Sequence, residues 1–484
     1  MYVYRNKDLP PDPHFPADLK GLGYFINGKD QIRQISNPEQ GFVFKINRND
    51  RYNVRQREAM NDCIREIVLA RLGDAGLDIL PLPLDTKLDE AHVPILVSKD
   101  FQNKPRIVLF LGEPSQDLGI FAYRAIHEGI SFGSAVNLAK AVLADEKAGL
   151  IIGNTGQLIW HNESERAVSH QTWQAIPRPY ANWGQATTSL RNKIPANHGW
   201  DQHVQYIFEK VLWPKVGKRT SIDIIGMSEG GHAAIKYLQK DWHVWKPYIS
   251  GMALADPQQT TYSDIDMGML TDPQSFTSFL ASRCRAYILS ADPVGTPQSG
   301  YRNHGCNCYS SGENLNTECI IPAAWEDMLS WLDLIYKNPE YSEHVMLREE
   351  DMDEEMRRDL EAQAEKENEL TGEAAEIEWL RVLDDAAAAE RDAKIAEKEA
   401  GAAKEAEKEA QEEDGTETGK DTEAGKEAAK DTQEDSTVEN LGDVSEEKKS
   451  FEGAENAGEA NDVQEDDTVQ NLGGISEDMK QLEV

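Results

Sequence analysis

The residues of this 484-residue chain that are best placed to do chemistry form a G-x-S-x-G pattern centred on Ser228. A β-branched run, Ser221–Ile225, precedes the pattern, and a helical pattern, His232–Gln239, follows it. The glycines of this segment are Gly226, Gly230 and Gly231. At such a strand–turn–helix corner the serine hydroxyl is exposed, and the glycines let strand and helix approach closely. The pattern predicts a nucleophile elbow; the alternative is an ordinary glycine-rich turn in which Ser228 caps the helix.

A nucleophilic serine needs a base within reach and an acid that orients the base. On α/β-hydrolase sheets the chain order is serine, then acid, then histidine. Asp292 follows a predicted strand and is the first candidate acid, and Asp256 is the alternative. Each is followed by proline at a strand end, so each could equally serve as a turn residue.

His304 is the candidate base, because it is the one histidine between Asp292 and His344. Its position is unusual for that role. The base normally follows the last strand, whereas His304 precedes the last predicted strand, 306–310, and the loop over 311–318 contains no histidine.

The loop that should complete an oxyanion hole is acidic. A second N–H is expected from the loop after the predicted strand Arg106–Leu111, where Pro114 lacks an N–H and Glu113 and Asp117 add negative charge. Glu229, next to the serine, adds another. Three carboxylates oppose the stabilisation of an oxyanion and would suit a cationic ligand instead.

The elements that must position these residues alternate between strand and helix. We expect a hairpin over 22–35, strands over 42–46, 106–111, 149–154, 221–225, 249–255, 284–290 and 306–310, a short extended segment over 77–84, and helices over 52–71, 134–146, 200–213 and 325–336. Continuous apolar strands alternating with helices predict an α/β-hydrolase-like fold, a mostly parallel sheet with helices on both faces. Ligands of such sheets bind at the carboxyl ends of the strands.

Charge divides the chain into parts. Of the net charge of −36, the residues from Arg348 onward carry 47 acidic and 16 basic side chains, and the remainder carries 39 and 34. The composition predicts a flexible arm over 1–18, a globular domain over 19–347, a charged Ala/Glu/Lys-rich helix over 348–410 and a disordered acidic tail over 411–484. In the tail, 433–449 recurs as 464–480, offset by 31 residues. The repeats are either partner-binding motifs or a neutral duplication.

Several function classes are disfavoured. No apolar run reaches the ~18–20 residues of a membrane span, and the first residues lack the apolar core of a secretory signal. Five cysteines with no export signal are expected to be reduced thiols, and Cys306 and Cys308 lack the spacing of a zinc site, so we expect no metal and no cofactor. Binding to a phosphate backbone requires clustered lysine and arginine residues. The chain has a net charge of −36 and only one notable basic cluster, Lys215, Lys218 and Arg219, so we expect no direct nucleic-acid binding.

A long polar insertion contains three tryptophans, Trp160, Trp173 and Trp183. We expect the residues over 156–200 to form a partner-binding surface; the alternative is a lid or a packed loop with its tryptophans in the core, since tryptophan is usually mostly buried.

Taken in order, these features resemble a known family, over roughly residues 15–340. The resemblance rests on Gly41-Phe42-Val43-Phe44, the helix over 52–71, His203-Val204-Gln205-Tyr206-Ile207, the elbow and Ala253-Leu254-Ala255-Asp256-Pro257. It is to the domain of the second Argonaute-binding protein of fission yeast, which also occurs at the C-terminus of fungal class II histone deacetylases and in an animal family of cotranscriptional regulators. The family loop after the first central strand usually resembles His-Gly-Ser-Gly, and a histidine often follows the last strand; here Leu111-Gly112-Glu113-Pro114 and Glu313-Asn314 stand at these places.

The resemblance implies an α/β-hydrolase-like fold and a nuclear role in small-RNA-directed heterochromatin formation, in a complex with Argonaute and a second Argonaute-binding subunit. It also implies that Ser228 matches a serine regarded as a possible nucleophile. Two hypotheses follow. The first is a non-enzymatic interaction subunit in an RNA-silencing complex. The resemblance implies that the protein is nuclear, and without it we would expect a cytoplasmic protein. The second is an active serine hydrolase that uses Ser228, His304 and Asp292.

Overall fold

The computed structural model describes residues 10–87, 89–178, 187–213, 217, 220–348, 358 and 394. The predicted helix over 348–410 and the predicted tail over 411–484 with its repeat lie outside the described residues, apart from Arg348, Arg358 and Lys394. Trp183 and the basic cluster around Lys218 lie outside them as well.

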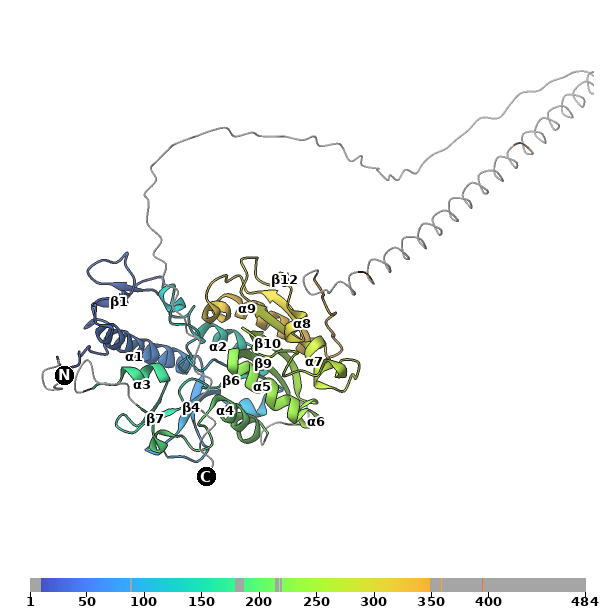
Figure 1. Cartoon of the computed structure of the whole chain (residues 1–484), viewed down its shortest axis with the longest axis horizontal. Helices are drawn as coiled ribbons and strands as arrows, with labels where there is room; N and C mark the ends of the chain where they lie inside the picture. Colours follow the sequence, from blue (N-terminus) through green and yellow to red (C-terminus); the bar gives the residue numbers. More distant parts are fainter. Residues whose placement is uncertain are drawn as a thin grey trace, which may run out of the picture. The chain divides into compact units, whose positions relative to one another are not determined.

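A mixed nine-stranded sheet forms the centre of the domain, in the order β12-β13-β11-β10-β9-β5-β6-β4-β3. Its strands are β3 (Leu77–Leu82), β4 (Val93–Ser98), β5 (Arg106–Leu111), β6 (Ala148–Ile152), β9 (Ser221–Met227), β10 (Ile249–Ala255), β11 (Cys284–Ile288), β12 (Pro297–Gln298) and β13 (Asn307–Ser310). Figure 1 shows strands β6, β9 and β10 of this sheet in the middle of the domain, with helices around them. The neighbouring strands β6, β5, β9, β10, β11 and β13 pair in parallel. The pairs β3–β4, β4–β6 and β12–β13 are antiparallel. This topology, with an antiparallel start, a crossover at β5 and β6 and a serine corner after β9, is that of an α/β-hydrolase sheet and confirms the predicted fold class.

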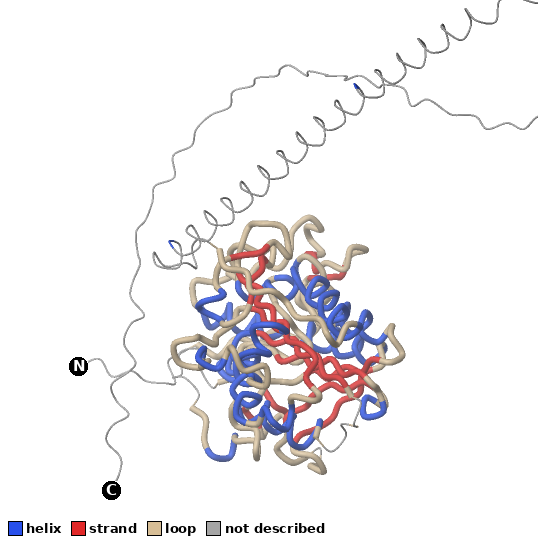
Figure 2. The backbone as a smooth tube through the Cα atoms, turned by 90° about the vertical axis from the view of Figure 1, so that its right-hand side faces the viewer, coloured by secondary structure: helices blue, strands red, loops and turns tan. Residues whose placement is uncertain are grey.

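Helices cover both faces of the sheet (Figure 2). The main ones are α1 (Asp50–Asp74), α2 (Val136–Leu143), α4 (Trp200–Tyr206), α5 (Ser228–Lys240), α7 (Phe276–Arg283) and α9 (Ile320–Lys337). Alternate residues of β5 point to opposite faces, because the side-chain period of a strand is two. Val108 and Phe110 pack with α1, α2 and α9, whereas Ile107 and Leu109 pack with α4, α5 and α7.

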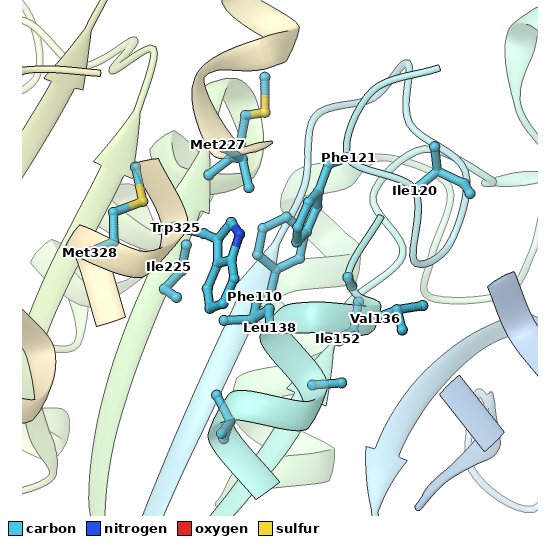
Figure 3. Close-up of a cluster of buried hydrophobic side chains, with 14 of the residues drawn as sticks. Phe110, Ile120, Phe121, Val136, Leu138, Ile152, Ile225, Met227, Trp325 and Met328 are labelled. Atoms are coloured by element: carbon cyan, nitrogen blue, oxygen red, sulfur yellow. The ribbon is translucent and has the colours of Figure 1, made fainter. Parts of the chain in front are cut away.

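The core on the α1, α2 and α9 face reaches the end of β5. Phe110 and Phe121 lie with their ring centroids 5.1 Å apart, and Trp325 of α9 and Ile225 of β9 lie beside them (Figure 3). Phe121 belongs to the loop that follows β5. The core therefore holds that loop in place next to the serine corner.

The hairpin prediction is confirmed by β1 (Tyr24–Ile26) and β2 (Ile32–Gln34). The prediction of a strand over 42–46 is wrong, because these residues form no strand. Phe42 is held by side-chain packing instead, with its ring centroid 5.6 Å from that of Tyr24 and 5.8 Å from that of His127. Strand β4 was not predicted from its sequence, where Pro94 interrupts a short apolar run. It pairs antiparallel with β3, and the alternation of strands and helices along the sequence, which predicts parallel pairs, does not indicate such a pair.

Within the proline-rich segment over 1–18, Asp12 is bound to α1. The Asp12 carboxylate accepts hydrogen bonds from Arg51 Nε at 2.6 Å and Nη2 at 2.7 Å, and both side chains are buried. This ion pair attaches the proline-rich segment to the start of α1.

The insertion after β6 is buried at two of its tryptophans, while much of its described remainder is exposed. It contains β7 (Ile159–His161), β8 (Arg166–Val168) and α3 (His170–Ala175). Trp160 and Trp173 are buried, with 4% and 8% of their surface exposed. These two tryptophans therefore lie in the core, as the alternative to a partner-binding surface predicted.

A buried charge network ties α1 to the loop after β5. Arg65 donates to Asp117 Oδ2 at 2.6 Å and to Glu58 Oε1 and Asp62 Oδ1 at 2.5 Å each. Burial raises the pKa of Glu58 despite the nearby arginine. Removing the cation would leave buried carboxylates unpaired.

We expect Arg65→Met to lower the free energy of unfolding by about 3–5 kcal/mol, because uncompensated buried charges are costly. The matched control is Arg166→Met, since Arg166 also binds Asp62, at 3.0 Å, but is largely exposed. That variant should lose no more than about 1 kcal/mol. Urea denaturation of both variants measures the difference, and equal losses would contradict the network's importance.

Candidate functional site at the serine corner

Ser228 occupies the predicted corner between β9 and α5, with a φ of 48°. A left-handed backbone at a non-glycine residue costs roughly 1–3 kcal/mol and persists only where its surroundings enforce it. Here the enforcement is close contact. A Cβ on Gly226 would lie 2.5 Å from Gly231 Cα, and a Cβ on Gly230 would lie 2.1 Å from the Gly112 carbonyl oxygen. The corner is thus pressed against its own strand and against the loop after β5.

The Ser228 hydroxyl is hydrogen-bonded to a carboxylate. It is 7% exposed and donates to Glu229 Oε2 at 2.7 Å. Among the described residues, no imidazole nitrogen forms a hydrogen bond with Ser228 Oγ. His232, on the same helix, instead lies 3.3 Å from Asp264 Oδ1.

Asp256, the alternative acid, lies at the end of β10 in the same neighbourhood. Its φ is also 48°, and its carboxylate accepts a hydrogen bond from Gln258 Nε2 at 3.1 Å. Burial and the charge of Glu229 raise the pKa of Asp256, against opposing effects from Gln258, Ser228 and His304. These influences place Ser228 and His304 within electrostatic range of Asp256.

His304, the candidate base, ends the short helix α8 (Tyr301–His304). Its Nδ1 lies 3.1 Å from the Gln259 carbonyl oxygen, which can only accept, so Nδ1 carries the proton and Nε2 keeps a lone pair. Burial lowers the pKa of His304, while the Gln259 carbonyl and Asp256 act in the opposite direction. Burial therefore favours the neutral ring, the Gln259 carbonyl orients it, and the charge of Asp256 acts on it.

Asp292, the first candidate acid, lies in the loop after β11. Its carboxylate is exposed and accepts a hydrogen bond from Gln298 Nε2 at 2.7 Å. It is not among the groups that shift the pKa of His304. A hydrogen bond from Ser228 and the charge of His304 thus both act on the pKa of Asp256, whereas Asp292 is hydrogen-bonded within its own turn.

One backbone N–H of the loop after β5 is already in use. The Glu113 N–H donates to Gln116 Oε1 at 3.2 Å. Gln116 is buried and held by its other end, where Nε2 donates to the Phe121 carbonyl at 2.5 Å and to Met227 Sδ at 3.1 Å. No sequence signal marked Gln116, because a glutamine in a loop has no characteristic pattern.

Carboxylates crowd this rim. Burial raises the pKa of Glu113, and so do the negative charges of Glu229, Glu318 and Asp256, while a hydrogen bond from Ser115 partly offsets them. Glu318, which sequence reasoning missed, belongs to η7 (Thr317–Cys319). Such a site disfavours a developing oxyanion.

Metal and membrane features are not found in the described part of the chain. There, no group of three or more His, Cys, Asp or Glu side chains is arranged to hold a metal ion, and the five cysteines are buried free thiols. No helix among the same residues is both long and apolar enough to cross a bilayer.

We expect Gly230→Ala to destabilise the protein by at least about 2 kcal/mol, because the new methyl group would overlap the Gly112 carbonyl. The control is Gly73→Ala in α1, where a Cβ meets nothing within 4 Å. That change should stabilise by up to about 1 kcal/mol through helix propensity. Thermal unfolding of both variants tests the contrast; a harmless Gly230→Ala would show that the corner is looser than described.

We expect Glu229→Gln to change the pH dependence of stability. Raised carboxyl pKa values mean that the folded state binds more protons, so these groups cost stability as pH rises from about 4 through the raised folded values. Removing the Glu229 charge lowers the pKa of Asp256 and Glu113, so the variant should lose less stability over this window. Urea midpoints from pH 4 to pH 8 measure it.

The control for this experiment is Glu313→Gln. Burial acts to raise the pKa of Glu313, but hydrogen bonds from the backbone N–H groups of Leu315 and Asn316 outweigh it and lower the pKa. Its stabilising effect is therefore present above the unfolded pKa and lost at acid pH. The control should lose stability near neutral pH, the opposite sign to Glu229→Gln.

Comparison with known proteins places this corner in a family. The Arb2 domain family matches residues 15–294. The mouse cotranscriptional regulator ARB2A is 31% identical over 320 residues, covering 60% of this chain and 74% of the mouse protein. A histone deacetylase structure from Saccharomyces cerevisiae is 11% identical with a TM-score of 0.34, covering 56% of this chain and 96% of the other. An esterase structure from Pyrobaculum calidifontis is 11% identical with a TM-score of 0.29, covering 62% and 94%. With more than half of its length matched, this chain belongs to the Arb2 domain family.

Proposed function

We propose that this protein is a non-enzymatic protein-interaction subunit of a nuclear complex that regulates transcription or chromatin. One observation supports this most strongly: the Ser228 hydroxyl is bound to Glu229 rather than to an imidazole. A serine nucleophile requires a base that removes its proton. The engagement of the Glu113 N–H by Gln116 adds to the same conclusion, because an oxyanion hole needs that donor free.

The regulatory part of the proposal draws on the family. Its curated relatives in mouse and in Xenopus tropicalis are named as cotranscriptional regulators. The resemblance to the Argonaute-binding domain suggests the finer assignment, an RNA-silencing complex that contains Argonaute and a second Argonaute-binding subunit. In this complex, contact with small RNA is made through a partner, since the chain as a whole carries a net charge of −36.

A second candidate, a serine hydrolase acting on an ester or amide, is favoured by His304. Its Nδ1 is held by a carbonyl, its Nε2 is left as an acceptor, and Asp256 lies within electrostatic range. A catalytic triad of Ser228, His304 and Asp292, as the sequence predicts, would need Asp292 to leave its turn. Any version would need Ser228 Oγ to rotate away from Glu229 and Gln116 to release the Glu113 N–H.

A fluorophosphonate probe separates the two candidates. We expect the wild-type protein to be labelled no more than Ser228→Ala, because an unactivated serine reacts slowly with this electrophile. Intact-protein mass spectrometry measures the modified fraction, and an active esterase in the same tube is the positive control. Stoichiometric labelling that disappears in Ser228→Ala would establish the hydrolase instead.

We also expect a tagged full-length chain to recover Argonaute from nuclear extract, with the yield unchanged by nuclease treatment and by Ser228→Ala. Immunoblotting measures the recovery, and a tag-only sample is the control. Recovery that is abolished by nuclease would mean that RNA bridges the two proteins.

A further inference from the structure

Two adjoining cavities lie beside the first half of α1, at the edge of the loop after β5. Their volumes are about 390 Å³ and 240 Å³. Both are lined by Arg57, Asn61, Tyr123, Arg124 and Glu318. We call this pair of cavities the α1 groove.

Asn61 is the first sign that the groove is made for a ligand. Its side chain is buried, with 5% exposed, yet it lines both cavities and has no hydrogen-bond partner within the described part of the chain. Its amide atoms are not among the fully buried polar atoms that lack a partner, so they are open to the cavities that the residue lines. The carboxamide is therefore available to whatever fills the groove, and it can donate to a carbonyl and accept from an N–H.

Arg57, one helical turn earlier, is the second sign. Its guanidinium lies 5.2 Å from the centroid of the Phe44 ring and makes no ion pair or hydrogen bond with any described residue. By contrast, Arg51 and Arg65 on the same helix are both paired with buried carboxylates. A guanidinium resting on an aromatic ring presents its fork of donors to a carboxylate.

The larger cavity of the groove has an apolar wall, and arginines lie near one side of it. Phe42, Met60 and Ile64 line the larger cavity, and Phe44 beside them is 44% exposed. Burial lowers the pKa of His127 on the same wall, and the charges of Arg33 and Arg124 lower it further. Arg124 itself is paired with Glu318 at 3.1 Å. Among the described residues that line the groove, Arg57 is thus a cation without a carboxylate partner, and it borders both cavities, whereas the Glu113 carboxylate borders the smaller cavity and accepts a hydrogen bond from Ser115.

We propose that the α1 groove binds a linear peptide of a partner protein, in which an acidic side chain stands next to an aliphatic or aromatic one. The carboxylate pairs with Arg57, the neighbouring apolar side chain packs on Phe42 and Phe44, and Asn61 bonds the peptide backbone. A carboxamide that both donates and accepts matches a peptide group better than it matches a free carboxylate, which only accepts. The proposal rests on the interaction role above and names the chemistry of one partner.

The test is selection of random linear heptapeptides from a display library on the full-length protein, followed by fluorescence polarisation with the enriched sequences. We expect enrichment of Asp or Glu adjacent to Leu, Ile, Val or Phe. Affinity should fall at least tenfold in Arg57→Gln, about tenfold in Asn61→Ala, and with rising salt, because the ion pair is partly exposed. Arg166→Gln, which removes an exposed arginine that already has a partner, is the matched control and should bind normally.

Folding is checked separately. Asn61→Ala removes an unpartnered carboxamide, so its urea midpoint should not fall, which separates loss of binding from loss of structure. Enrichment of basic peptides, or binding unaffected by Arg57→Gln and Asn61→Ala, would overturn the proposal. So would a change of molecular mass on sedimentation in Arg57→Gln without peptide, because it would mean that a second copy of the chain fills the groove. Argonaute recovery by a protein that binds no peptide would leave the proposed function standing while this inference fails.

Discussion

The serine corner depends on one close contact, between Gly230 on α5 and the Gly112 carbonyl after β5. With 2.1 Å between that oxygen and the place of a Cβ, only glycine permits it. The contact presses two loop ends together at the carboxyl edge of the sheet, where ligand sites of such sheets form. It also holds Ser228 in a left-handed conformation and sets Glu113 and Gln116 beside it. Corner and loop are therefore one unit.

Within that unit the geometry of a hydrolase is kept while its hydrogen bonds are redirected. The strained serine and the glycine contacts are those that expose a nucleophile. Yet the hydroxyl is bound by its own neighbour, Glu229, and the N–H of Glu113 is bound by Gln116. This is consistent with a role in which the domain serves as a rigid surface.

Helix α1 shows how one element serves both stability and recognition. Arg51 and Arg65 are buried with carboxylates and fix the helix to the segment before the hairpin and to the loop after β5. Arg57 lies on the side that faces the α1 groove and is paired with none of the described carboxylates. The difference follows from helical periodicity, since residues 51, 57 and 65 lie at different angles around the axis. A helix backbone held by two of its arginines presents the third from a fixed position.

The sequence by itself determined the sheet-to-helix corner at Ser228, most of the parallel strands and the long helix after the hairpin, because these depend on local periodicity and on glycines at fixed spacing. Only the tertiary structure decided which side chains meet at the corner. Asp256 rather than Asp292 acts on the pKa of His304, and Gln116 occupies the Glu113 N–H, since both outcomes depend on how loops from distant strands approach one another. The same holds for antiparallel β4, for the burial of Trp160 and Trp173, and for the unpartnered Asn61. Spacing along the chain encodes local conformation, but contacts between segments a hundred residues apart are set by packing.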